Sequence, residues 1–242
     1  MPLIFIFTRL EIPRFSCNFA FKFLFKEQMK TASRTILFIA LFLFPYFIQA
    51  QTYKIEGGYV QQLQSGKQAS ATYFDGFQAG VVTSFDIREY FTGEIGTLYS
   101  YLYSNKLQLY PHEDSVTYRT SIHSINIPVH VTFTYPFIKK VNFFLYAGPT
   151  FNIGLSQPQT IVAKLTDKLS SMTGIPQGIT HKELYKDNML HRFNLQFGAG
   201  GGFQWKKYQL KSGYDFGLIN LKKSSPGSLY QKGWFVTLLY QF

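Results

Sequence analysis

Residues 191–205 read HRFNLQFGAGGGFQW, and large apolar side chains alternate with polar residues and glycines along the whole segment. Successive side chains of a β-strand point to opposite faces, so this period of two predicts a strand with one apolar face. That face holds Phe193, Leu195, Phe197, Ala199, Gly201, Phe203 and Trp205. Because the alternation continues through the glycines, they belong to a strand and not to a phosphate-binding loop, which would lead into a helix.

The same alternation recurs in a chain rich in aromatic residues, with 26 Phe and 17 Tyr. Apolar faces stand out at residues 141–156, 125–135 and 91–103. In the last of these, Tyr99, Tyr101 and Tyr103 cluster at one end, as aromatic residues do at a membrane interface. We expect eight strands, at residues 53–62, 77–87, 90–103, 118–135, 141–156, 191–205, 208–220 and 234–242.

The connections between these strands alternate strictly in length. Long gaps at 62–76, 104–117, 157–190 and 221–233 separate short gaps at 88–89, 136–140 and 206–207. Outer-membrane barrels join their strands in this way, with short periplasmic turns and longer outer loops. The sequence therefore predicts an all-β fold, an eight-stranded antiparallel up-and-down transmembrane β-barrel. A soluble lipocalin-like barrel is the alternative, and its outward faces would have to be polar.

The chain ends in GWFVTLLYQF, with Trp234, Tyr240 and Phe242 on one strand face. A final strand that stops on an aromatic residue is typical of an outer-membrane barrel, so we expect these three residues to mark the closing strand. At the other end, residues 29–50 form a basic stretch, an apolar run of about a dozen residues and a small residue, as in a secretory signal peptide. We expect cleavage after Ala50, a mature barrel domain at 51–242 in the outer membrane, and an untranslated extension at 1–28.

The whole chain carries a formal net charge of +11, but its basic residues form no dense run. This argues against nucleic acid as a partner. Contact with anionic lipid head groups and lipopolysaccharide phosphates explains the excess of positive charge more simply. We expect outer-membrane lipid, lipopolysaccharide and the barrel-assembly machinery as partners. The single cysteine, Cys17, lies in the segment expected to be absent from the mature protein.

The interior of an eight-stranded barrel is just wide enough for side chains to fill it. Buried charges must be paired or solvated, so we expect the inward ionisable residues to form a polar network. Its predicted members are Lys54, Glu56, Glu94, His130, Arg192, Lys211 and Asp215.

The long gap at 157–190 exceeds what a connection needs, and such loops are usually functional or disordered. Apolar residues within 161–172 fit a short amphipathic helix. We expect an outer contact surface that includes Lys164, Lys168, Lys182 and Lys186. A loop without a partner is the alternative.

No catalytic, metal or cofactor pattern is present in the sequence. None of the five histidines has a metal-binding spacing. His191 and Ser156 bracket the long loop and could form an esterase-like pair, but no third partner or GxSxG motif supports it. We therefore predict no cofactor and no enzyme activity.

Four motifs in register resemble the PorT-like outer-membrane β-barrel family of the Bacteroidota: SINIPV at 124–129, FLYAGP at 144–149, FGAGGGF at 197–203 and YDFGLIN at 214–220. The resemblance implies a small outer-membrane barrel whose role is structural or based on protein interaction. It also implies a place as an accessory of an envelope secretion or assembly system, with secretion-system proteins as partners. A narrow channel for small solutes and a rim-located lipid-modifying enzyme are the alternatives.

Overall fold

The computed structural model describes residues 51–67, 69–111, 114–223 and 227–242, all within the compact unit Ala50–Phe242. The expected signal peptide, its cleavage site and the upstream extension lie outside the described residues. Eight strands form the barrel wall: β1 (Gln51–Gly66), β2 (Ala69–Arg88), β3 (Phe91–Leu109), β4 (Ser115–Ile138), β5 (Val141–Ser156), β8 (Phe193–Trp205), β9 (Tyr208–Gly217) and β10 (Tyr230–Gln241).

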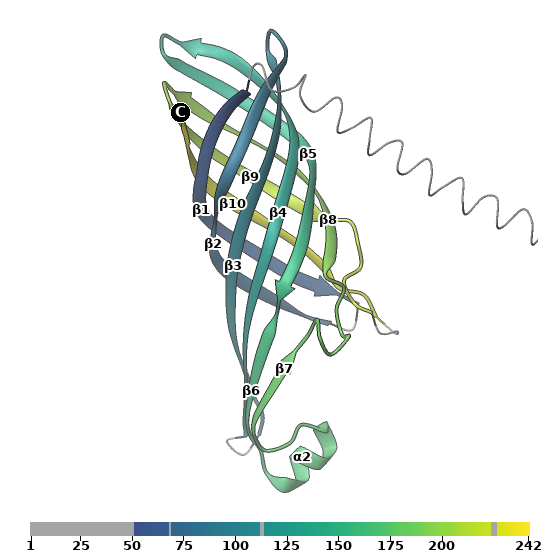
Figure 1. The fold of residues 1–242 in the computed structure, drawn as a ribbon. Helices are drawn as coiled ribbons and strands as arrows, with labels where there is room; N and C mark the ends of the chain where they lie inside the picture. The colour runs from purple at the N-terminus through teal and green to yellow at the C-terminus, as the bar shows by residue number, and fades with distance from the viewer. Residues whose placement is uncertain (1–50, 68, 112–113, 224–226) are drawn as a thin grey trace, which may run out of the picture. The chain divides into compact units, whose positions relative to one another are not determined.

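Antiparallel pairing closes these eight strands into a ring (Figure 1). β10 pairs with β9 on one side and with β1 on the other, and β3 pairs with β4. The prediction of an eight-stranded up-and-down barrel is confirmed. The three short connections, at residues 89–90, 139–140 and 206–207, lie at the same end as the start of β1 and the end of β10, which we call the turn end.

Two of the gaps that we expected to be loops are strand instead. β1 and β2 remain paired as far as Gly66 and Ala69, and β3 and β4 remain paired as far as Leu109 and Ser115. The polar residues of these gaps can pair in an antiparallel hairpin as well as apolar residues do, because ladder hydrogen bonds come from the backbone. The strands therefore extend well past the apolar segments that revealed them.

A third long gap, residues 157–190, is a folded projection. It holds β6 (Pro158–Lys164), α2 (Asp167–Thr173) and β7 (Gly178–Glu183), with β6 paired to the extended part of β4. We call residues 158–183 the arm, and the end of the barrel that carries it the arm end (Figure 1). The helix expected at 161–172 is wrong in its first half, because residues 159–164 pair with β4 and Ile161 and Ala163 bury one strand face.

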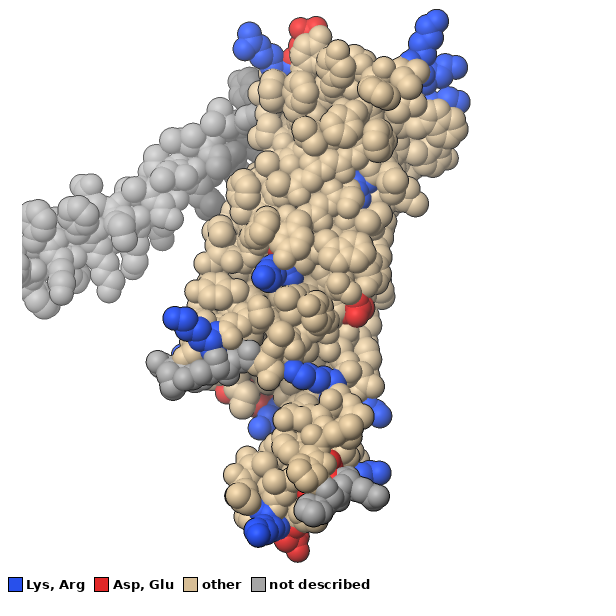
Figure 2. All heavy atoms as spheres, turned by 180° about the vertical axis from the view of Figure 1, so that it is seen from behind, with Lys and Arg blue, Asp and Glu red and all other residues tan. Residues whose placement is uncertain are grey.

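The outer wall is apolar between two rims of aromatic residues. Along β10, Tyr240 lies toward the turn end and Trp234 toward the arm end, with the exposed Val236 and Leu238 between them. The two aromatic residues are six positions apart, which corresponds to about 20 Å along a strand. Figure 2 shows a mostly uncharged wall, with Lys and Arg side chains toward both ends of the molecule. This arrangement is that of a surface facing the hydrocarbon of a membrane, with aromatic residues at its two interfaces.

The helix α2 is short, and no helix among the described residues is long and apolar enough to cross a membrane.

Candidate functional site

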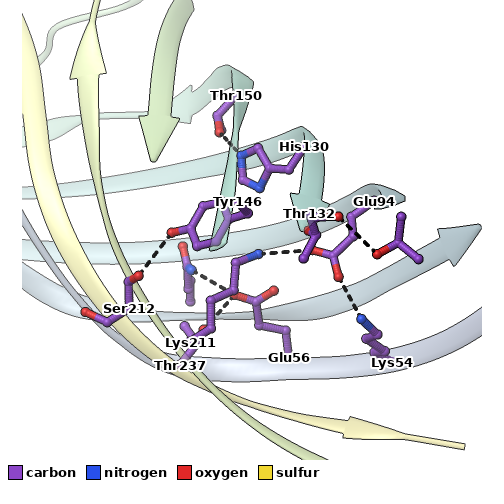
Figure 3. A network of polar contacts seen from close by, with 12 residues as sticks. Lys54, Glu56, Glu94, His130, Thr132, Tyr146, Thr150, Lys211, Ser212 and Thr237 are labelled. Atoms are coloured by element: carbon purple, nitrogen blue, oxygen red, sulfur yellow. Dashed lines mark hydrogen bonds and ion pairs between the residues drawn. The ribbon is translucent and has the colours of Figure 1, made fainter. Parts of the chain in front are cut away.

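The interior of the barrel holds a buried ion-pair group near the turn end (Figure 3). The Glu94 carboxylate on β3 accepts from both Lys54 on β1 and Lys211 on β9, with its Oε1 2.6 Å from Lys54 Nζ and its Oε2 3.5 Å from Lys211 Nζ. All three side chains are at least 94 % buried. Because β3 and β9 are not neighbours in the ring, the second contact crosses the interior and links opposite walls.

Glu56 lies inside the same interior and is 1 % exposed. Its Oε1 accepts from Thr237 Oγ1 at 2.8 Å and from Gln78 Nε2 at 3.5 Å, while its Oε2 has no hydrogen-bond partner among the described residues. Asp215 is partly buried on the inward face of β9, and its Oδ1 is likewise without a described partner.

His130 and Tyr146 form an aromatic pair beside these charges. Their rings stack at 4.9 Å, and His130 Nε2 lies 3.3 Å from Thr150 Oγ1. The Lys211 ammonium sits 4.4 Å from the centre of the Tyr146 ring, a favourable cation–π contact. The Tyr146 hydroxyl donates to the backbone oxygen of Ser212 at 3.4 Å. The structure thus brings Lys54, Glu56, Glu94, His130 and Lys211 together in the interior.

Arg192 is the exception among the predicted network residues. It is exposed, and its guanidinium donates to the backbone oxygens of Gly154 and Leu155 at 3.2 and 2.5 Å and lies over the Tyr185 ring. The prediction was wrong because β8 begins at Phe193, so Arg192 precedes the paired strand although it continues the sequence alternation. Burial raises the pKa of Tyr185 to about 12, and the Glu183 carboxylate adds to that rise.

An apolar layer that the sequence pattern does not predict fills the middle of the interior. Its side chains come from six strands and are buried against one another: Val60, Phe74, Leu102, Ile122, Phe144, Tyr146 and Phe235. The signal was present in segments such as Tyr101-Leu102-Tyr103, where both strand faces are apolar. A period of two cannot show which of two apolar faces points inward.

Glycines on β8 and β9 complete this layer. A Cβ atom at Gly202 would lie 2.6 Å from Phe144 Cζ, and a Cβ atom at Gly200 would lie 2.6 Å from the Tyr146 hydroxyl oxygen. The two aromatic rings therefore lie directly against this part of the wall. The layer separates two cavities, one of about 240 Å³ at the arm end with Phe74 in its lining, and one of about 190 Å³ at the turn end with Phe144 in its lining.

The arm is attached firmly to the extended β3–β4 hairpin. Val116, Ile161, Ala163 and Leu165 form a second buried apolar cluster. The buried Asp114 carboxylate accepts from the Thr166 backbone N–H at 2.8 Å and from its hydroxyl at 3.0 Å. The four lysines predicted to form an outer contact surface lie exposed on the arm or just after it, and they are Lys164, Lys168, Lys182 and Lys186.

The closing-strand residues lie on the outer face of β10. Trp234 Nε1 donates to Gln61 Oε1 at 2.9 Å, and the Tyr240 ring packs between Tyr208 and Phe242 at 5.3 and 5.5 Å. The Phe242 backbone N–H donates to the Tyr53 backbone oxygen at 3.1 Å. These contacts fasten β10 to β1 and β9.

The described residues contain no group of three or more His, Cys, Asp or Glu side chains placed to hold a metal ion. His191 is exposed and Ser156 is half-buried, and no hydrogen bond joins these two described residues. The esterase-like pair considered from the sequence is therefore not assembled.

Comparison with protein families gives one match, to the outer membrane protein beta-barrel domain, over residues 48–223. This chain belongs to that family. The matched range contains β1 to β9, including the arm and every residue of the ion-pair group. As a member of an outer-membrane barrel family with an apolar, aromatic-rimmed wall, the protein is located in the outer membrane.

Several solved structures are also similar to this chain. Neisserial surface protein A aligns over 80 % of this chain and 100 % of its own, with 9 % identity and a TM-score of 0.42. Ail, the attachment invasion locus protein of Yersinia pestis, aligns over the same shares with 11 % identity and a TM-score of 0.38. The N-terminal barrel domain of Pseudomonas aeruginosa OprF does so with 8 % identity and a TM-score of 0.29. No curated protein matches the chain.

Proposed function

We propose that this protein is a sealed outer-membrane anchor that displays the arm outside the cell for contact with other envelope proteins. The observation that carries the proposal is the combination of a filled interior with a folded projection at one end. The interior is closed by the apolar layer and by the Lys54–Glu94–Lys211 ion pairs, which favours an anchor over a channel. The arm end carries the longest connection, and in bacterial barrels the longer connections face outward.

The arm has the properties of a contact surface. Its strands are held rigidly by the buried cluster around Ile161 and by Asp114, so its exposed face is preorganised. Four exposed lysines are distributed along it and just beyond it, and β7 pairs with β6 on one side and, within the described part of the chain, with no other strand. An unpaired strand edge and charged side chains both serve recognition of a protein partner.

The motif resemblance supports a more specific assignment of family, export and role. We infer a PorT-like protein of the Bacteroidota that is exported by the signal at 29–50, matured to begin at Gln51 and inserted by the barrel-assembly machinery. It contacts lipid and lipopolysaccharide through its wall and rims, and acts without enzyme activity or cofactor as an accessory of a secretion or assembly system. The partner of the arm is then a protein of that system.

Reversing the charge of the four lysines Lys164, Lys168, Lys182 and Lys186 to Glu tests this role. A photo-crosslinker placed at Met172, which is 76 % exposed on α2, reports contacts of the arm in intact cells. Four exposed lysines suit an acidic partner surface, which the introduced glutamates would repel, so we expect the reversal to lower the yield of cross-linked envelope protein about tenfold or more.

The matched control reverses four exposed lysines at the turn end, Lys139, Lys140, Lys206 and Lys207, and should leave the cross-link yield unchanged. A second variant replaces residues 159–182 by a two-residue Asn-Gly turn, since Pro158 and Glu183 are direct partners at the base of the arm. Two results together would refute the proposed role. The protein without the arm would still capture every partner through cross-linkers placed elsewhere on the barrel, and the lysine reversal would leave the cross-link yield unchanged.

A further inference from the structure

A polar cup lies at the arm end of the interior, on the opposite side of the apolar layer from the Lys54–Glu94 ion pair. Its volume is about 240 Å³, and amide and hydroxyl side chains dominate its lining: Gln64, Thr72, Ser104, Thr120, Gln157 and Gln159. Phe74, a member of the apolar layer, is among its lining residues. Neither the anchor role nor the arm accounts for this cup.

Strand register assembles the cup. Gln64 on β1 is the direct partner of Thr72 on β2, Ser104 on β3 is the partner of Thr120 on β4, and Thr120 is in turn the partner of Gln159 on β6. Inward-pointing side chains of paired strands necessarily lie at the same level. The walls are therefore strands of the barrel and its extension, and the cup is preformed.

A ladder of glutamine amides fixes one side of the cup. Gln157 Nε2 donates to Gln64 Oε1 at 3.5 Å, Gln64 Nε2 donates to Gln231 Oε1 at 3.0 Å, and Gln231 Nε2 donates to Gln62 Oε1. Because the Gln157 amide nitrogen is used in this ladder, its oxygen must face away from it. That oxygen is fully buried, in a side chain only 1 % exposed, and accepts no hydrogen bond from any described residue. An atom this buried is out of reach of an occupant, so Gln157 contributes to the cup by fixing the Gln64 amide in its wall.

The lining also limits the chemistry of the occupant. Among the described residues that line the cup, Lys106 alone is charged, and its ammonium already donates to the Ala71 backbone oxygen at 3.1 Å. Phe74 and Tyr118 add aromatic surface. Amides and hydroxyls offer donors and acceptors side by side, which suits a ring carrying several hydroxyl groups and apolar C–H faces. The cup is smaller than the usual site for a drug-sized ligand, so it has room for one such ring.

We propose that this cup binds a single sugar residue, whose hydroxyl groups exchange hydrogen bonds with the amide and hydroxyl side chains of the lining and whose ring face lies against the half-buried Tyr118. The sugar comes either from a free saccharide or from the end of a cell-surface glycan. Both present the same ring and hydroxyl groups, and the probes below distinguish them.

Saturation-transfer NMR on the full-length mature protein tests the proposal. The protein is held in a zwitterionic detergent, because a detergent with a sugar head group would compete for the cup. One probe set is glucose, galactose and mannose, and the other is the oligosaccharide released by mild acid from the lipopolysaccharide of the same bacterium. We expect saturation transfer to ring protons of at least one probe. Transfer from the monosaccharides identifies a free-saccharide site, and transfer from the oligosaccharide alone identifies a glycan site.

Gln157→Leu keeps the approximate shape of the side chain and removes the buried amide that fixes Gln64, and we expect it to weaken binding about tenfold. Thr72→Tyr fills the cup from its half-buried edge and should abolish binding. Gln209→Leu is the matched control, because Gln209 is a buried glutamine at the turn-end cavity, and it should bind as the unmodified protein does.

Each variant is first shown to be folded by its heat-dependent gel migration, so lost binding cannot come from a collapsed barrel. Absence of saturation transfer from every probe overturns the proposal. So does binding that folded Gln157→Leu and Thr72→Tyr proteins retain at full strength. Neither result would bear on the arm, whose test does not involve the cup.

Discussion

Glu94→Gln is expected to destabilise the barrel severely, by about 3–5 kcal/mol, as does the removal of one partner from a buried ion pair. The substitution preserves shape but removes the carboxylate that both Lys54 and Lys211 contact. Lys54 is then left with no carboxylate in ion-pair distance among the described residues. Urea unfolding of the purified protein in detergent, followed by tryptophan fluorescence and by heat-dependent gel migration, measures the loss.

Two companion variants separate this effect from a general response to charge removal. Glu89→Gln changes an exposed carboxylate in a turn and should unfold at the same urea concentration as the unmodified protein. Glu94→Gln combined with Lys54→Met removes one of the two ammonium groups left without a carboxylate partner, so it should recover part of the lost stability. An unfolding midpoint for Glu94→Gln equal to that of Glu89→Gln would show that the ion pairs do not hold the interior together.

Gly213→Ala is expected to cause the second large loss, although it adds only one methyl group. A Cβ atom there would lie 1.7 Å from the Tyr146 hydroxyl oxygen and 3.0 Å from the backbone oxygen of Ala199. Tyr146 cannot move away without losing its stacking on His130 and its contact with Lys211. Overpacking of this kind costs about 1–3 kcal/mol, and the same urea titration measures it.

Gly57→Ala is the matched control for this prediction. Gly57 is also a strand glycine, but the nearest atoms to an added Cβ are 3.9 Å away or more, an ordinary contact distance. Tyr146→Phe in the Gly213→Ala background removes the clashing oxygen and leaves Cζ at 2.9 Å, so it should restore part of the stability. Equal stability of the Gly213→Ala and Gly57→Ala proteins would contradict the packing described for Tyr146.

The fold was predictable because the alternation of residues within each segment and the spacing of the apolar segments are both local features of the sequence. Residues 193–205 illustrate this, since the predicted apolar face is largely exposed on the outer wall while Asn194 and Gln196 are buried inside. The same alternation assigned Lys54, Glu94 and Lys211 to the interior. It could not show that Glu94 would contact both lysines, because that depends on the closure of the ring and the width of the interior.

The remaining errors have physical causes that a sequence pattern does not reveal. Leu102 and Phe235 form part of the apolar layer, but they lie on strands with two apolar faces. The pattern therefore could not show which face points inward. Arg192 continues the alternation of β8 but precedes its first ladder pair, so its side chain is free to turn outward. Residues 159–164 carry apolar side chains at spacings that fit a helix, but the unpaired edge of the extended β4 captures them as a strand.

Single-channel recording from the reconstituted protein in a planar bilayer tests the sealed interior most directly. Flotation of the same proteoliposomes first establishes that the protein has inserted. The account predicts no unitary conductance, since the apolar layer and the Glu94 ion pairs separate the cavities at the two ends. Discrete, reproducible current steps from the unmodified protein would contradict it and would show that the interior conducts.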